Sequence, residues 1–428
     1  MRYPPIHQCP GDLFYVISVE EALNKVLSFI EVLKPEERPI LDALGQVLAE
    51  EIRSNIDVPP LNNSAMDGFA VRAEDTYGAL ESSPVFLPVI DQVAAGYLSN
   101  KTVTSKTAIR IMTGASVPDG ANAVVQFEDT DEVLRKSTKD SSSTIGIKKQ
   151  VKKGQNIRFK GEDISKGMNV LPCGTLLRPS EIGVLASLGY SKVSVIRRPV
   201  VAVLATGDEL IDIGQTLIPG KIYNSNAYSI AAQIKRYGGN PKILGIGLDS
   251  IESIENKIDE ARGCDMLITS GGVSLGDYDV VKDVLSRRGE IAIWTVNMKP
   301  GKPSAFGTIT DGDKKMLHLG LPGNPVSSMI TFEQFARPAI LKMMGIKNTA
   351  KPTIKAIIDD DVMNSDGRRI YARVAVSKID DIFHASLTGP QGSGILTSMT
   401  KANGLAIIPE NTNGVKAGDM VQIQMIDW

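Results

Sequence analysis

Three glycine-rich turns hold residues whose types and spacing could do chemistry. They are Thr269–Asp279 (TSGGVSLGDYD), Lys299–Pro303 (KPGKP) and Leu321–Pro325 (LPGNP). Glycine lets backbone N–H groups approach a ligand, and proline stiffens a turn. Carboxylate and lysine side chains lie between them, which suits an anion and a metal ion. The sequence therefore predicts a functional site in this stretch.

Acidic residues follow the apolar runs of the same stretch, namely Asp208, Glu209, Asp249, Asp277 and Asp279. Carboxylates that converge at one edge repel one another and a phosphate unless a divalent cation neutralises them. We therefore expect magnesium, whereas either of two of these residues alone, Asp249 or Asp279, also fits a helix cap.

Lys299 and Lys302 lie three residues apart within the Pro-Gly-Pro frame. Two ammonium groups held beside loop N–H donors suit an anion, and a pair of solvated surface lysines is the alternative. GGVSLG is not the GxxxxGK[ST] of a P-loop, and no GxGxxG is followed by an acidic residue in the dinucleotide-binding arrangement.

A parallel sheet with helices on both faces is the architecture expected to position these turns. Buried strands are predicted within residues 199–210, 241–249, 264–272 and 315–323. Crossover helices are predicted at Asn226–Tyr237, Ile251–Arg262, Tyr278–Arg287 and Pro325–Met344. Ligands of such sheets bind at the carboxyl ends of the strands.

Outside this domain the pattern predicts helices at 18–33, capped by Ser18, and at 41–52. Short β-branched runs between about 59 and 153 indicate an inserted β domain. A helix at 178–190, with Ser180 as its cap, follows it.

The prediction is a multi-domain α/β protein with a central three-layer α/β/α domain and a mostly parallel sheet. The expected domains are a discontinuous α+β linker and dimerisation domain (14–58 with 154–197), the inserted β domain (59–153), the α/β domain (198–346) and a barrel-like β domain (347–428). The serine-rich segment 136–144 predicts a hairpin tip, and nothing in it indicates a function.

Composition narrows the class of protein. With 47 basic and 49 acidic residues there is no charge excess that would favour nucleic acid. No long apolar run or secretion signal is present in these 428 residues, so we expect no membrane span and a cytoplasmic location. Three scattered histidines argue against a Ser-His-Asp triad or a histidine metal site, so a metal would have oxygen ligands.

Seven motifs occur in an order typical of one family: NNSAMDGFAV, RIMTGA, GEDI, TGDEL, TSGGVSLGDYD, KPGKP and LPGNPVS. In them the chain resembles the MoeA-like molybdopterin molybdenumtransferases, which include the E domain of gephyrin and the equivalent domain of plant Cnx proteins. The resemblance implies a homodimer of four-domain subunits whose third domain has the molybdopterin-binding fold. It also implies Mg²⁺-dependent cleavage of adenylylated molybdopterin, release of AMP and insertion of molybdate to form molybdenum cofactor, with a molybdopterin adenylyltransferase as upstream partner.

The resemblance also assigns site residues. Three lie outside the α/β domain and are expected to complete the cleft of the neighbouring subunit: Asp67, Thr113 and Asp163. Magnesium and pyrophosphate are assigned to Glu209, Asp249 and Asp279, and the oxyanion to Lys299 and Lys302. Substrate-binding positions are Gly271, Gly272, Ser274, Pro322, Pro325 and Ser327, with Arg373 and Ser393 at the molybdate end.

Two of these residues also have a purely structural interpretation. Asp67 beside Gly68 also fits a turn, and a strand arginine such as Arg373 is usually a solvated charge. Two other functions stay open. One is a gephyrin-like dimeric scaffold, although KPGKP stands where gephyrin-type sequences have KPGLP. The other is a magnesium-dependent nucleotide or sugar-phosphate hydrolase on the same fold.

Overall fold

A computed structural model describes residues 16–132, 134, 143–272, 283–284, 287–311 and 314–427. The described chain divides into two compact units. One contains residues 16–37, 45–47 and 194–427, and the other contains 38–44 and 48–193. The four predicted domain boundaries stay a prediction.

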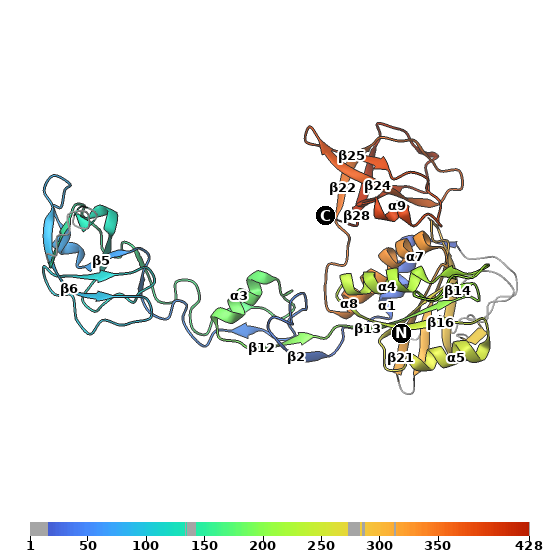
Figure 1. Cartoon of the computed structure of the whole chain (residues 1–428), viewed down its shortest axis with the longest axis horizontal. Helices are drawn as coiled ribbons and strands as arrows, with labels where there is room; N and C mark the ends of the chain where they lie inside the picture. The colour runs from blue at the N-terminus through green and yellow to red at the C-terminus, as the bar shows by residue number, and fades with distance from the viewer. Residues whose placement is uncertain are drawn as a thin grey trace. The chain divides into compact units, whose positions relative to one another are not determined.

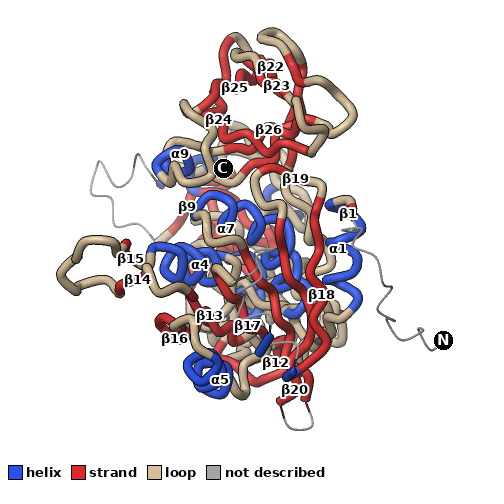
Figure 2. Tube along the Cα trace, turned by 90° about the vertical axis from the view of Figure 1, so that its right-hand side faces the viewer, coloured by secondary structure: helices blue, strands red, loops and turns tan. Residues whose placement is uncertain are grey.

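The first unit is built on a mixed seven-stranded sheet (Figures 1 and 2). In spatial order its strands are β1 (Val16–Ile17), β18 (Gly289–Val296), β20 (Pro303–Asp311), β21 (Lys314–Leu321), β17 (Met266–Ser270), β13 (Val200–Thr206) and β16 (Asn240–Gly247). The four predicted strands pair in parallel, as expected. The sequence reasoning missed β18 and β20, and β20 pairs antiparallel with both β18 and β21.

Helices cover both faces of this sheet, which confirms the three-layer prediction. On one face lie α1 (Val19–Ser28), α4 (Ser225–Arg236), α7 (Pro325–Thr331), the π-helical turn η3 (Phe332–Ala336) and α8 (Arg337–Met343). On the other lies α5 (Ile251–Glu260). Figure 1 shows the first group between the sheet and the carboxyl-terminal β domain.

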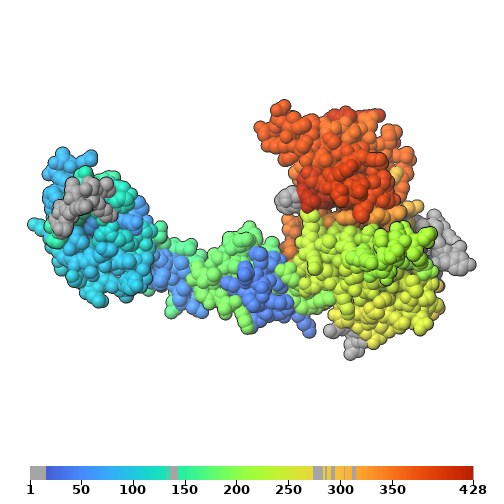
Figure 3. All heavy atoms as spheres, in the orientation of Figure 1, coloured from blue at the N-terminus to red at the C-terminus, as the bar shows by residue number. Residues whose placement is uncertain are grey.

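The carboxyl-terminal β domain is a closed sheet, as predicted. Its order is β19 (Met298–Lys299), β24 (Arg369–Ile379), β25 (Ile382–Leu387), β22 (Thr353–Ile358), β28 (Met420–Met425) and β26 (Gly404–Ile408), with β24 also pairing β26. A two-stranded sheet of β23 (Val362–Met363) and β27 (Gly414–Val415) and the short helix α9 (Thr397–Thr400) complete it. Tyr371, Leu405 and Ile426 join the hydrophobic core of the α/β domain, so the two domains pack directly together (Figure 3).

The second unit holds a five-stranded sheet and several short elements. The sheet order is β8 (Ala123–Gln126), β5 (Gly68–Val71), β7 (Ala108–Ile111), β6 (Val85–Val93) and β9 (Thr144–Ile147). The 3-10 turns are η1 (Ala73–Thr76) and η2 (Phe127–Asp129), and the helix is α3 (Pro179–Ser187). Its small two-stranded sheets include β10 (Ile157–Arg158) with β4 (Asn63–Ser64) and β11 (Asn169–Leu171) with β3 (Ile52–Arg53). The sheet of β12 (Lys192–Ile196) with β2 (Pro35–Pro39) has residues in both units.

Several helix predictions need correction. The helix predicted at 41–52 is wrong, because the segment consists of turns around Gly45 at φ +78° and leaves Leu41 72% exposed. The segment still buries Ala43, Val47 and Leu48, but from turns rather than from one face of a helix. Helix α1 has the predicted Ser18 cap, which accepts the Glu21 N–H at 3.0 Å, but it ends at Ser28 rather than at 33.

The helix at 178–190 forms as α3, but its N-cap is Arg178 and not Ser180. The Glu181 carboxylate reaches back to the Arg178 N–H at 2.9 Å, which places the N-cap two residues before the predicted Ser180. Most of the helix predicted at Tyr278–Arg287 lies outside the described residues, as does most of segment 136–144.

Candidate active site

A pocket of about 510 Å³ opens at the carboxyl ends of β13, β16, β17 and β21, where the sheet was predicted to bind a ligand. This volume is within the range that binds drug-sized or nucleotide-sized ligands. The residues that line it are Ala205, Thr206, Gly207, Glu209, Leu210, Ile222, Tyr223, Asn224, Ser225, Asn226, Asp249, Ser270, Gly271, Gly272, Gly323, Pro325 and Gly394. Ile222 and Tyr223 belong to the short strand β15, which pairs with β14 (Leu210–Ile211).

The amino-terminal end of α4 forms one wall of the pocket. Buried Asn224 caps the helix by accepting the Ala227 N–H at 3.2 Å. The Asn226 amide donates to Ser270 Oγ at 2.8 Å and to the Gly323 carbonyl at 2.7 Å. One side chain therefore ties the turns after β17 and β21 to the helix end, whose dipole favours negative charge.

The predicted carboxylates meet at this rim in part. Glu209 and Asp249 both line the pocket and are exposed, and the Asp249 N–H donates to Asp208 Oδ1 at 3.1 Å. Among the described residues no group of three or more His, Cys, Asp or Glu is arranged as a metal site. Two carboxylates among amide and hydroxyl oxygens nevertheless form a donor set that suits Mg²⁺. Asp279, Asp277 and Ser274 lie outside the described residues.

Some of the other site residues predicted in the α/β domain line the pocket, and others do not. Gly271, Gly272 and Pro325 line the pocket, whereas buried Pro322 and Ser327 are not among its lining residues. Lys299 and Lys302 are exposed and do not line it either. The ammonium group of Lys299 is paired with Asp366 of the last domain at 3.2 Å. Their assignment to an oxyanion stays a prediction.

Arg373 is not a solvated surface charge, because only 1% of it is exposed. Its guanidinium donates to Ser398 Oγ and to the Gly392 carbonyl, both at 3.1 Å. Burial lowers its pKa to about 10. Arg373 therefore supports the loop that carries Gly394, which lines the pocket. The Ser393 carbonyl of that loop accepts the Val326 N–H at 3.0 Å.

In the second unit, Asp67 and Thr113 are in contact. Their positions in the sequence do not indicate this. Asp67 Oδ1 accepts the Thr113 N–H at 2.6 Å and the Thr113 hydroxyl at 2.8 Å. These bonds, the backbone one first, lower the pKa of Asp67. Asp163 is exposed on another loop, where its N–H donates to the Val58 carbonyl at 3.1 Å. The alternative interpretation of Asp67 as a turn-forming residue does not account for its hydrogen bonds to Thr113.

Replacing Thr113 by valine should raise the pKa of Asp67 part of the way back to its usual value, because the backbone donor remains when the hydroxyl is lost. Carboxyl chemical shifts followed through an acid titration measure this. Thr113→Ser keeps the hydroxyl and is the matched control. An unchanged pKa in the valine variant would show that the hydroxyl bond is not made in solution.

Sequence reasoning missed Asn224, Asn226 and Tyr223. A signal for the first two was present, because Asn224 lies just before the helix predicted from Asn226 and asparagine is favoured at the start of a helix. For Tyr223 no local pattern indicated a pocket position, since it lies on a two-residue strand.

Three family models match the chain over most of its length. Residues 202–342 match the family model described as a probable molybdopterin binding domain. Residues 17–189 match the MoeA N-terminal region (domain I and II), and 355–426 match the MoeA C-terminal region (domain IV). The chain belongs to the MoeA family.

Relatives in this family are similar over nearly their whole length. The chain is 38% identical over 414 residues to the molybdopterin molybdenumtransferase of Staphylococcus epidermidis, covering 95% of each chain. It is 35% identical over 412 residues to that of Bacillus subtilis, covering 96% of this chain and 94% of the relative. The crystal structure of the molybdopterin biosynthesis MoeA protein from Pyrococcus horikoshii OT3 matches with a TM-score of 0.78 at 32% identity, covering 96% of this chain and all of that one.

Proposed function

We propose that this protein is a molybdopterin molybdenumtransferase, which cleaves adenylylated molybdopterin, releases AMP and inserts molybdate into the dithiolene. The observation that carries the proposal is the pocket at the sheet's carboxyl edge, where a helix end favours anionic phosphate beside the carboxylates Glu209 and Asp249. The family relatives that bear this activity by name support it.

Within the pocket we assign anchoring of the phosphate groups to the amino-terminal end of α4 and the glycine turn at Gly271–Gly272. Glu209 and Asp249, with Asp279, would hold Mg²⁺, which when bound polarises the phosphoanhydride for attack. Lys299 and Lys302 would offset the charge of molybdate, a doubly charged anion. The loop that Arg373 supports closes the molybdate end.

We further propose that the protein works as a homodimer in the cytoplasm and receives its substrate from a molybdopterin adenylyltransferase. In that dimer Asp67, Thr113 and Asp163 complete the partner's cleft. Asp67 and Thr113 form one hydrogen-bonded unit, which suits a shared role. Among the described residues no helix is long and apolar enough to cross a membrane.

The test incubates purified protein with adenylylated molybdopterin, Mg²⁺ and molybdate, and follows AMP release and reconstitution of an apo-molybdoenzyme. Both signals are expected. Glu209→Gln and Asp249→Asn should each lower the rate of AMP release by about a hundredfold or more, as expected when a metal ligand or pyrophosphate contact is removed.

Glu252→Gln is the matched control, because it neutralises an exposed carboxylate on α5 of the same domain. Turnover of ordinary nucleotides without pterin would favour a phosphohydrolase. A folded dimer that gives neither AMP nor cofactor would favour a scaffold. Parent rates in both pocket variants would remove Glu209 and Asp249 from the mechanism.

A further inference from the structure

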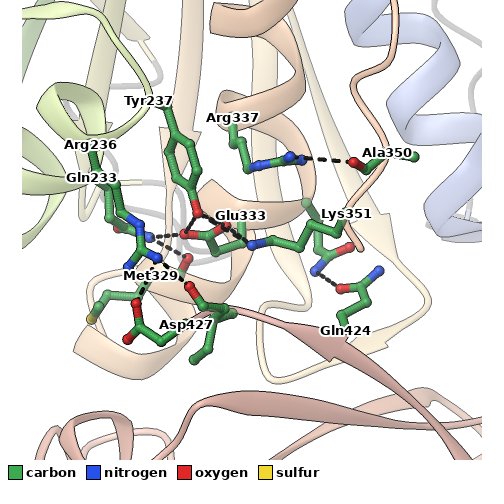
Figure 4. A network of polar contacts seen from close by, with 12 residues as sticks. Gln233, Arg236, Tyr237, Met329, Glu333, Arg337, Ala350, Lys351, Gln424 and Asp427 are labelled. Atoms are coloured by element: carbon green, nitrogen blue, oxygen red, sulfur yellow. Dashed lines mark hydrogen bonds and ion pairs between the residues drawn. The ribbon is translucent and has the colours of Figure 1, made fainter. Parts of the chain in front are cut away.

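A buried carboxylate lies in the α/β domain on the helices behind the pocket. Glu333, in the π-helical turn η3, is 6% exposed and accepts hydrogen bonds from two residues of α4 or its C-cap, Gln233 Nε2 at 2.8 Å and the Tyr237 hydroxyl at 2.9 Å. The third partner is the ammonium group of Lys351, at 2.5 Å, whose side chain is 5% exposed. Figure 4 shows these side chains converging on Glu333.

Lys351 lies in the connection that leads into β22 of the last β domain. Arg337 of α8 holds the same connection, donating to the Thr349 carbonyl at 2.8 Å. The guanidinium of Arg337 also lies 5.2 Å from the centre of the Tyr237 ring, a cation–π distance. Glu333 therefore fastens the entry to the last domain onto the helices of the α/β domain.

Two further contacts join the same region to β28 and the residues after it. Arg236 at the end of α4 pairs with Asp427 at 2.6 Å, and Gln334 of η3 donates to Gln424 Oε1 at 2.9 Å. Both pairs appear in Figure 4 beside Glu333. The last domain is thus tied to the α/β domain at the connection before its first strand and at its last strand with the residues after it.

The elements that meet at Glu333 are the ones that build the pocket at their other ends. Helix α4 begins at the pocket with Ser225 and Asn226, and the helical run that contains Glu333 begins there with Pro325. The last domain contributes Gly394, and its Ser393 carbonyl bonds the Val326 N–H. A change in how the last domain sits on these helices would therefore move one wall of the pocket.

We propose that Glu333 and Lys351 are positioning residues that hold the last β domain on α4 and η3 so that the 390–394 loop closes the pocket. Neither residue lines the pocket. Their role in turnover rests on the proposed function, whereas their role in holding the loop does not. Loss of the tie loosens the loop and weakens substrate binding.

Three variants separate positioning from simple stabilisation. Removing one partner of a buried pair leaves an uncompensated charge, so Glu333→Gln and Lys351→Met alone should lower stability strongly. The double variant Glu333→Gln/Lys351→Met removes both charges and should recover much of that stability. The tie is still missing in it, which makes it the informative variant.

Hydrogen exchange of the intact protein measures the loop directly. In the double variant, the amides of residues 389–396 should exchange about tenfold faster than in the parent, although they lie at the far end of the helices. The KM for adenylylated molybdopterin should rise about tenfold while kcat changes by less than about threefold. The control is Lys257→Met/Glu260→Gln, which removes an exposed ion pair of 2.9 Å on α5 and should change neither quantity.

The proposal is overturned if the double variant exchanges at the parent rate in 389–396, or if faster exchange stays confined to residues around 333 and 351. Parent values of KM alongside a loosened loop would remove the link to substrate binding. A parent protein that releases no AMP contradicts the proposed function, and loop exchange then still decides the positioning role.

Discussion

Replacing Gly271 by alanine is expected to lower ligand affinity at the pocket by about a hundredfold or more and to destabilise the α/β domain by about 1–3 kcal/mol. Gly271 has φ +90°, a conformation that costs other residues energy. An added Cβ would lie 2.7 Å from the Thr206 carbonyl oxygen, which belongs to the backbone and cannot turn away. The ends of β13 and β17 would have to separate, and both line the pocket.

Titration calorimetry with AMP as the probe measures the affinity, and thermal unfolding measures the stability. Gly263→Ala is the matched control, since Gly263 has φ +79° but an added Cβ there meets nothing within 4 Å. That variant should lose only the stability that backbone strain at a positive φ costs, and it should bind AMP as the parent does. Equal losses in both variants would show that backbone strain, rather than the close approach to Thr206, sets the affinity.

The folding stability of the α/β domain should fall steeply as the solution is acidified, because of His318. This residue on β21 is fully buried, and burial lowers its pKa to about 3. In the unfolded chain a histidine titrates near 6.5, so below that pH the unfolded state binds a proton that the native state does not. Stability is therefore lost as pH falls from about 6.5 toward 3, by about 3 kcal/mol between pH 7 and 4.

Hydrogen exchange of the β17 and β21 amides, measured across this range, follows the stability of the domain itself. His318→Gln cannot titrate and can still bond Thr269 Oγ1, which lies 3.1 Å from His318 Nε2, so its stability should depend less on pH. The parent protein, which keeps His318, is the comparison and should show the full dependence. If the His318 variant also keeps the full dependence, other groups cause the acid loss.

Much of the α/β domain could be predicted because its strands are apolar runs bounded by glycine turns. The run before Thr206 and the run before Ser270 each specify a buried parallel strand without help from distant residues. The edge of the sheet that binds ligands follows from that topology, which is why Glu209 and Asp249 were found. A buried strand can therefore be predicted where an uninterrupted apolar run ends at a glycine turn.

The remaining features depend on contacts between distant segments. Segment 41–52 has helical spacing and buries Ala43, Val47 and Leu48, but it does so in turns rather than along a helical face, so tertiary context overrides periodicity there. Arg373 is buried because backbone carbonyls of a loop near Gly392 satisfy it, and no neighbouring residue in the sequence reveals that. Likewise Asp67 and Thr113 meet through the pairing of β5 with β7, which periodicity cannot register.

Strand β1 precedes the second unit in the chain, yet its partner is β18, so Val16 pairs with Thr295. During synthesis on the ribosome, β1 and α1 leave the exit tunnel before β18 has been made and cannot complete their sheet until then. Residues 48–193 can fold in the meantime, since their contacts are mostly internal. The α/β sheet can therefore be completed only after the second unit has been synthesised.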